Sequence, residues 1–257
     1  MNEVDRLVDI MARLRAPGGC PWDAQQTHRA LRPYLLEETY EVIEALDRGD
    51  FDALRGELGD LLLQIVFHAQ IGSEAGAFDL QAIARSINEK LIHRHPHVFG
   101  DVEVDGPSQV LVNWEKLKLE ESENADRTSA LDGIPAELPA LARATKIQKK
   151  AARVGFDWDD ASGPRAKLDE ELAELDEAIA AGDERAIEHE LGDVLFSICN
   201  LARFLSADSE SALRSAIGRF SERFARMETL AGEQGVSMAD LDIDGLERLW
   251  QQAKAVE

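Results

Sequence analysis

Residues 188–199 read EHELGDVLFSIC, and residues 55–66 read RGELGDLLLQIV. Both stretches begin with charged residues and continue with mostly apolar ones, which predicts helices that are buried on most sides. A second pair of similar segments precedes them, LLEETYEVIEAL at 35–46 and LDEELAELDEAI at 168–179. Glu37 aligns with Glu170 and Asp60 with Asp193, both at a separation of 133 residues. The chain therefore contains an internal repeat of a two-helix unit.

The repeat extends outward and predicts two homologous units. Trp22 pairs with Trp158, and Trp114 pairs with Trp250, both at a separation of 136 residues. The segment between the units joins a charge run to Asp, Ser, Gly and Pro residues, a composition typical of linkers and turns. We expect the boundary near residue 125, with domains at 1–125 and 126–257. Strand patterns are nearly absent and QVLV at 109–112 is the best of them, so we predict an all-α protein made of two tandem helical bundles.

The net charge restricts the classes of partner. The 28 Lys and Arg residues stand against 50 Asp and Glu residues, which gives a net charge of −22. Such a surface repels phosphate backbones and anionic lipids, which argues against a nucleic-acid polymer or a membrane as partner. The charged first fifteen residues and the lack of a long apolar run predict neither an export signal nor a transmembrane helix. Two well-separated cysteines fit a reducing cytoplasm, where we expect the protein to act.

A line of polar residues follows the apolar helix of the second unit. Glu190, Asp193, Ser197 and Asn200 succeed one another at steps of three, four and three residues, which places them on one helix face. Carboxylates in such surroundings repel each other and lose hydration, so a cation between them is expected. The preceding helix carries the sequence EE-x-x-E at 170–174, and its face can meet Glu190 and Asp193 across a bundle.

The first unit repeats this pattern of carboxylates. Its members are Glu37, Glu38, Glu41, Glu57 and Asp60. An all-oxygen donor set of this kind suits Mg²⁺ or Mn²⁺. A di-iron bundle ordinarily needs Glu-x-x-His on two helices, and no histidine of this sequence follows a glutamate at that spacing. For HRHPHVF at 93–99 we favour a helix end with stacked imidazoles over a zinc site, because Pro96 breaks the helical face and no cysteine is near.

Taken together, these motifs resemble those of the MazG family of nucleoside triphosphate pyrophosphohydrolases. The resemblance covers essentially the whole chain and rests on the paired EE-x-x-E and E-x-x-D patterns, GCPWD, RHPHVF and VGFDW. It implies an all-α fold, a homodimer, and Mg²⁺-dependent hydrolysis of surplus or noncanonical NTPs and dNTPs to the monophosphate and pyrophosphate. The residues it implies as metal ligands are Glu171, Glu174, Glu190 and Asp193 in the second unit, and Glu38, Glu41, Glu57 and Asp60 in the first.

Other residues are candidates for the substrate and the attacking water. A carboxylate that does not bind metal is needed to orient the water, and we predict Glu170 for this role. Arg219 and Arg223 lie four residues apart on one predicted helix face, as do Trp250 and Lys254, and these residues suit the outer phosphates and the base. Asn200 is a candidate near the metal.

The two halves differ, and other functions remain open. The position of Asn200 is held by Phe67 in the first half, and that of Arg219 by Lys90. Since Asn can bind near a metal whereas Phe cannot, we predict that the second half is the main catalytic unit. The alternatives to an enzyme are a regulatory or adaptor protein that binds metal and nucleotide without turnover, and a purely structural helical dimer.

Overall fold

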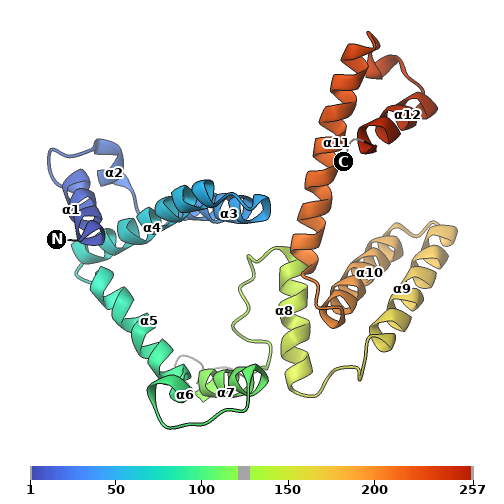
Figure 1. Cartoon of the computed structure of the whole chain (residues 1–257). Helices are drawn as coiled ribbons and strands as arrows, with labels where there is room; N and C mark the ends of the chain where they lie inside the picture. Colours follow the sequence, from blue (N-terminus) through green and yellow to red (C-terminus); the bar gives the residue numbers. More distant parts are fainter. Residues whose placement is uncertain (1, 121–127, 256–257) are drawn as a thin grey trace. The chain divides into compact units, whose positions relative to one another are not determined.

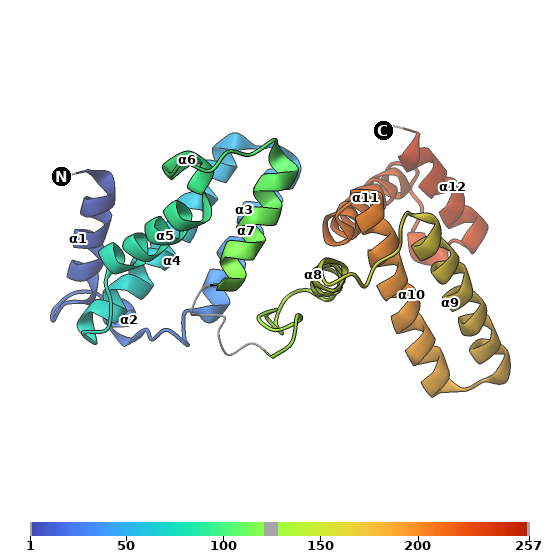
Figure 2. The ribbon, with the colours of Figure 1, turned by 90° about the horizontal axis from the view of Figure 1, so that it is seen from below.

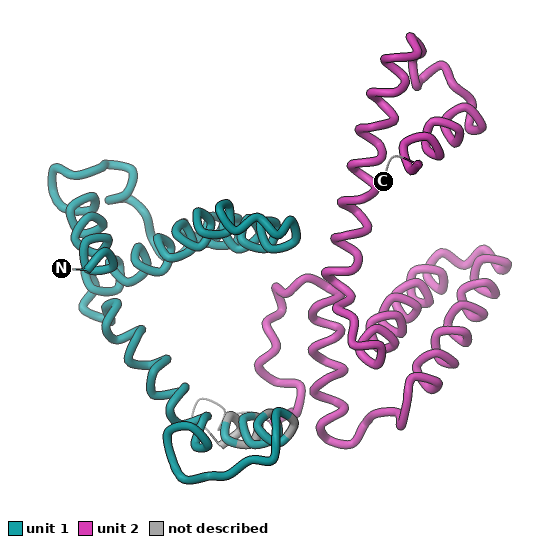
Figure 3. The backbone as a smooth tube through the Cα atoms, viewed as in Figure 1, with its two compact units in different colours: residues 1–125 teal, residues 126–257 magenta. Residues whose placement is uncertain are grey.

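The computed structural model describes residues 2–120 and 128–255. Every regular element in these two ranges is helical, which confirms the predicted all-α class (Figure 1). The chain divides into two compact units, residues 1–125 and 126–257 (Figure 3). The predicted boundary itself lies outside the described residues. In the described part of the chain, no helix combines the length and the apolar character that a bilayer crossing needs.

Unit 1 contains seven described helices. They are α1 (Glu3–Arg15), α2 (Pro21–Gln25), α3 (Arg32–Arg48), α4 (Phe51–Glu74), α5 (Leu80–Arg94), α6 (Pro96–Phe99) and α7 (Pro107–Glu120). Its buried apolar cluster joins Met11 of α1 and Leu31 to Val66 and Phe67 of α4. The segment QVLV at 109–112, the best strand pattern of the sequence, lies inside α7.

The histidine-rich segment forms a break between two helices of unit 1. His95 ends α5 and precedes Pro96, the first residue of α6. The rings of His95 and His97 lie 5.6 Å apart at an angle of 51°. The imidazoles are therefore tilted rather than stacked as expected.

Unit 2 contains five described α-helices and one short 3₁₀ helix. They are α8 (Ala140–Arg153), α9 (Ser162–Ala181), α10 (Glu184–Phe204), α11 (Ser209–Glu233), η2 (Met238–Asp240) and α12 (Ile243–Lys254). Figures 1 and 2 show α9 and α10 side by side as an antiparallel pair. A second apolar cluster joins Met227 and Ala231 of α11 to Leu249 and Ala253 of α12.

The same Gly–Asp turn connects the paired helices in both units. Helix α3 ends at Gly49, whose φ of +66° is left-handed, and the side chain of Asp50 then accepts hydrogen bonds from the first backbone amides of α4. Gly182, with a φ of +67°, and Asp183 do the same between α9 and α10. Glycine adopts this conformation without a steric penalty, and Asp is a favoured N-cap. The repeat in sequence is thus a repeat in local structure, and it fixes which faces of the two helices meet.

Candidate metal centre

In unit 1 the paired helices bring three of the four predicted metal ligands together. Carboxylate oxygens of Glu38 on α3 and of Glu57 and Asp60 on α4 lie within 4.8 Å of one another. Desolvation and the charges of Asp60 and Glu41 raise the pKa of Glu38, and desolvation with the charges of Glu41 and Asp60 raises that of Glu57. Glu41 is therefore close enough to Glu38 and Glu57 for its charge to raise the pKa of both. A cation between these carboxylates would offset both the repulsion and the desolvation.

Unit 2 forms the corresponding cluster from α9 and α10. Carboxylate oxygens of Glu171, Glu174 and Glu190 lie within 4.8 Å of one another. Desolvation, followed by the charges of Glu171 and Glu190, raises the pKa of Glu174. Asp193, the fourth predicted ligand, forms a neighbouring group with Glu190. The structure therefore places the other three predicted carboxylates of this unit close to Glu190.

Lys167 is a member of this site that the motif did not indicate. Its Nζ atom lies 2.6 Å from Oε1 of Glu171 and 2.9 Å from Oε1 of Glu170, on the same helix. Glu171 is only 5% exposed, so this ammonium is a close counter-charge to an almost buried carboxylate. Hydrogen bonds to Glu171 and Glu170 raise the pKa of Lys167. Glu170, predicted to activate water, thus has a cationic partner and an exposed carboxylate beside the cluster.

His189 is a second addition to the site of unit 2. Its Nδ1 atom lies 3.3 Å from Oε1 of Glu190 and 3.1 Å from Oδ2 of Asp193. Sequence reasoning missed it because the search for histidine ligands used the Glu-x-x-His spacing of di-iron proteins. The signal that finds it is the spacing from His189 to Asp193, which at i and i+4 places both side chains on one helix face.

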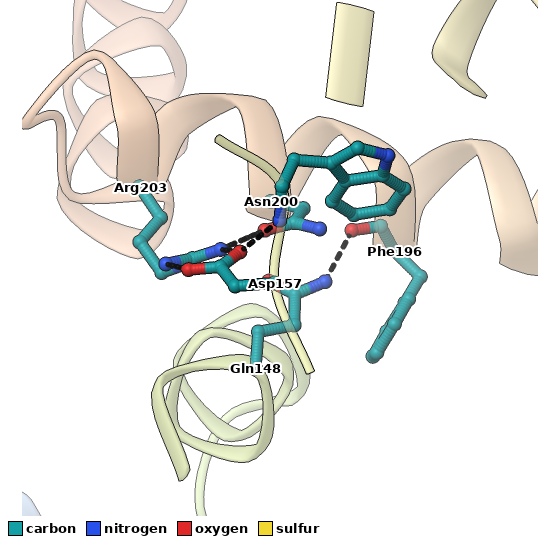
Figure 4. A network of polar contacts seen from close by, with 6 residues as sticks. Gln148, Asp157, Phe196, Asn200 and Arg203 are labelled. Carbon is teal, nitrogen blue, oxygen red and sulfur yellow. Dashed lines mark hydrogen bonds and ion pairs between the residues drawn. The ribbon is translucent and has the colours of Figure 1, made fainter. Parts of the chain in front are cut away.

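Asn200 is buried and takes part in a polar network, which Figure 4 shows. Its side-chain oxygen accepts hydrogen bonds from Nε and Nη2 of Arg203, at 3.1 and 2.8 Å. Arg203 also binds Asp157 through both of its terminal nitrogens. From α8, Gln148 donates to the backbone oxygen of Phe196 at 2.7 Å. This network joins α8, α10 and the segment before α9, and sequence reasoning did not foresee it.

The remaining predicted substrate residues lie on α11 and α12, a different pair of helices from the carboxylates. Arg223 of α11 lies over the ring of Trp250 of α12, 5.6 Å from its centroid. Phe220 packs against the same ring at 5.2 Å. Arg219 and Lys254 are exposed. The structure therefore brings Arg223 and Trp250 together and leaves Arg219 and Lys254 accessible on the same helices.

The donor atoms of both clusters fit a hard divalent cation. Every predicted ligand is a carboxylate, the donor that Mg²⁺ and Mn²⁺ prefer, and each cluster joins two helices that a tight turn holds in register. A cation would offset the desolvation and the repulsion that together raise the pKa of Glu38, Glu57 and Glu174. These acidic clusters can therefore bind a divalent metal ion.

A model of the MazG nucleotide pyrophosphohydrolase domain matches the chain twice, at residues 26–99 and 163–228. The two matches cover more than half of the chain, and each contains one carboxylate cluster. The chain belongs to the MazG family. It carries the MazG nucleotide pyrophosphohydrolase domain twice, in tandem.

Two nucleoside triphosphate pyrophosphohydrolases match this chain over nearly its whole length. A nucleoside triphosphate pyrophosphohydrolase of Escherichia coli K12 is 48% identical over 260 residues, covering 100% of this chain and 99% of that protein. The MazG nucleoside triphosphate pyrophosphohydrolase/pyrophosphatase of Thermotoga maritima is 49% identical, covering 97% of this chain and 95% of that protein. A crystal structure of a MazG-related protein from Thermotoga maritima, 27% identical, covers 44% of this chain and 97% of that one with a TM-score of 0.39.

Proposed function

We propose that this chain hydrolyses nucleoside triphosphates, NTPs and dNTPs alike, to the monophosphate and pyrophosphate, with Mg²⁺ as cofactor and Mn²⁺ as a substitute. The observation that carries the proposal is the carboxylate cluster between paired helices, which occurs once in each unit. A chain of net charge −22 repels a nucleotide with about four negative charges unless cations lie between them. The pairing of an acidic site with an anionic substrate is therefore an argument for a metal-dependent reaction.

The metal ligands that we propose are the predicted ones. They are Glu171, Glu174, Glu190 and Asp193 in unit 2, and Glu38, Glu41, Glu57 and Asp60 in unit 1. When bound, Mg²⁺ polarises the phosphoryl group, lowers the pKa of a bound water and offsets the charge of the leaving group. The chain's own part is to hold the carboxylates close together, which the Gly–Asp turns and the helix pairing accomplish.

We assign the orientation of the attacking water to Glu170. This carboxylate is exposed beside the cluster, and its neighbour Glu171 faces Glu174 and Glu190. Nζ of Lys167 lies 2.9 Å from Oε1 of Glu170 and keeps this carboxylate beside the cluster, where it can accept a proton from the attacking water. Nζ of Lys167 also lies 2.6 Å from Oε1 of Glu171, so one ammonium group contacts both neighbouring carboxylates.

The nucleotide contacts that we propose come from Asn200, Arg219, Arg223, Trp250 and Lys254. The exposed Arg219 and Lys254 suit the outer phosphates, and the Arg223–Trp250 pair offers a cation over an aromatic face on which a base can stack. The side-chain oxygen of Asn200 already accepts from Arg203, so the NH₂ group, a donor, is the part that we assign to the nucleotide. Unit 2 carries this full set, and we propose that it is the main catalytic unit.

We also propose that the protein is a homodimer in the cytoplasm. Apolar side chains on the carboxylate helices of unit 2 are exposed, among them Leu172 of α9 and Leu191, Leu195 and Phe196 of α10. A second copy that packs on this face removes apolar surface from water, at about 25 cal/mol per Å². The free thiols of Cys20 and Cys199 fit a reducing compartment. The acidic charge favours a small nucleotide over a nucleic-acid polymer or a membrane.

The experiment that tests this function is pyrophosphate release from the purified full chain, with each common NTP and dNTP, in Mg²⁺, in Mn²⁺ and in excess EDTA. We expect turnover with either metal and loss of turnover with the chelator. Full turnover in EDTA would contradict the metal assignment. Nucleotide binding without turnover in any metal would contradict the enzyme and favour the regulatory alternative.

A further inference from the structure

Unit 2 holds an imidazole at its carboxylate cluster, and unit 1 does not. His189 precedes Glu190 by one residue and Asp193 by four on α10. The residue at the matching position of α4, 133 residues earlier, is Gly56. The two carboxylate clusters of the chain therefore differ by one imidazole nitrogen that can bind a metal ion.

The imidazole lies within hydrogen-bond distance of two of the predicted metal ligands. One nitrogen of His189 and one oxygen each of Glu190 and Asp193 lie within 4.8 Å of one another. The separations from Nδ1 are 3.1 Å to Asp193 and 3.3 Å to Glu190. Two neighbouring ligands on an octahedral ion with bonds of about 2.1 Å lie about 3.0 Å apart. The two separations from Nδ1 are therefore close to the spacing that ligands of one shared ion require.

His189 lies at the surface of α10, where an ion can reach its side chain from solvent. The side chain is 73% exposed, so an ion reaches it without any opening of the helix pair. Glu190 belongs both to this group and to the group with Glu171 and Glu174, which links the imidazole to the main cluster. Imidazole nitrogen binds transition ions better than it binds Mg²⁺, which prefers oxygen ligands alone.

We propose that His189 supplies a nitrogen ligand to a divalent ion held with Glu190 and Asp193, and that unit 2 thereby prefers Mn²⁺ over Mg²⁺ more strongly than unit 1 does. The inference rests on the proposed function, because it requires that the carboxylate clusters bind a divalent ion. It goes further in assigning a ligand and a metal preference that distinguish the two units.

The test is a spectrum of Mn²⁺ bound to the full chain. Electron spin-echo modulation detects a directly bound ¹⁴N nucleus, and the signal of free Mn²⁺ at room temperature reports how much metal is bound. We expect nitrogen modulation in the native chain, its loss in His189→Ala, and its retention in His93→Ala, which removes an exposed histidine of α5. His189→Ala should also weaken Mn²⁺ binding by at least about tenfold, with Mg²⁺ binding changed far less.

A gain-of-ligand variant makes the test reciprocal. Gly56→His puts an imidazole at the matching position of unit 1, where a Cβ atom meets nothing within 4 Å. In the His189→Ala background this change should restore the nitrogen modulation, and no return would contradict the claim that the helical spacing places the ligand. Bound Mn²⁺ without nitrogen modulation in the native chain would overturn the inference and leave the carboxylate site intact. Absence of any bound Mn²⁺ would overturn both.

Discussion

Nη1 of Arg203 lies 2.8 Å from Oδ2 of Asp157, across 46 residues of sequence. The pair is mostly buried, with side-chain exposures of 14% and 26%. Arg203 also holds Asn200, so one guanidinium joins the segment before α9 to the helix that carries Glu190 and Asp193. The ion pair thereby stabilises the arrangement of the elements that carry the candidate site in unit 2.

The first prediction concerns the ion pair between Asp157 and Arg203. Asp157→Asn should lower the free energy of unfolding at pH 7 by about 2 kcal/mol, the scale of hydrogen bonds to charged groups. Hydrogen bonds from Arg203 hold the pKa of Asp157 below its ordinary value of 3.8. The stabilisation is therefore complete above that value and is lost as the pH falls through the lower pKa of the folded state. Urea unfolding followed by circular dichroism should show that the free energies of unfolding of the native chain and the variant converge below about pH 4.

A matched control separates this effect from the general loss of a carboxylate. Asp169 pairs with Arg165 on the surface of α9, where both side chains are more than half exposed. Asp169→Asn should change stability by less than about 1 kcal/mol. Equal losses of stability in the two variants would contradict a special role of the Asp157–Arg203 ion pair. A stability difference between Asp157→Asn and the native chain that persists unchanged at pH 3 would contradict it as well.

The second prediction concerns the repulsion in unit 1. The pKa of Glu57 is raised, so its charge opposes folding above its ordinary value and protonation relieves the cost. Without metal, Glu57→Gln should therefore raise the melting temperature at pH 7, and the gain should shrink as the pH falls toward 4.5. In Mg²⁺ the variant should instead have a lower melting temperature than the native chain, because it has lost a metal ligand. A variant less stable than the native chain in EDTA at pH 7 would show that Glu57 is a structural partner instead.

The third prediction concerns the difference between the units. Glu171→Ala or Asp193→Ala should abolish most turnover, because the other carboxylates then repel one another around a weakly bound metal. Glu38→Ala or Asp60→Ala should cost less, because unit 1 has Phe67 where unit 2 has Asn200. The measurement is steady-state pyrophosphate release, with circular dichroism to verify folding. Equal losses from both pairs of variants would mean that both units catalyse or that they share one site.

Much of the fold was predictable because helical spacing is a short-range pattern and the chain shows the same pattern twice. The spacing of apolar residues and the matched carboxylates indicated the α3–α4 and α9–α10 pairs, and helical steps of three and four placed Glu190 and Asp193 on one face. The β-branched run QVLV was misleading, because its neighbours continue a helix and local propensity is weak against that context.

The rest of the site depends on contacts that spacing alone does not reveal. The bond from Arg203 to Asp157 spans 46 residues, and the repeat does not mark it. Lys167 and His189 lie at helical spacing from the carboxylates, but Tyr34 and Gly56 hold their positions in unit 1. A search for features common to both halves therefore passes over the residues that make the second half different.

The fourth prediction concerns assembly. Light scattering at micromolar concentration should give about 57 kDa, twice the 28.4 kDa of one chain. Leu195→Glu puts a charge on the exposed apolar face of α10 and should shift the protein toward the monomer, since burying that charge costs several kcal/mol. A native chain that remains at 28.4 kDa would contradict the homodimer.

The most direct test of the central claim is hydrolysis in ¹⁸O-labelled water with Mg²⁺, followed by mass spectrometry of the products. If water attacks the α-phosphorus, the label enters the nucleoside monophosphate, pyrophosphate leaves unlabelled, and the diphosphate is a poorer substrate because only monophosphate can leave. The sequence has no G-x-x-x-x-G-K-[ST] loop that would hold a γ-phosphate for transfer. We therefore expect labelled monophosphate; labelled inorganic phosphate with accumulating nucleoside diphosphate would contradict the account.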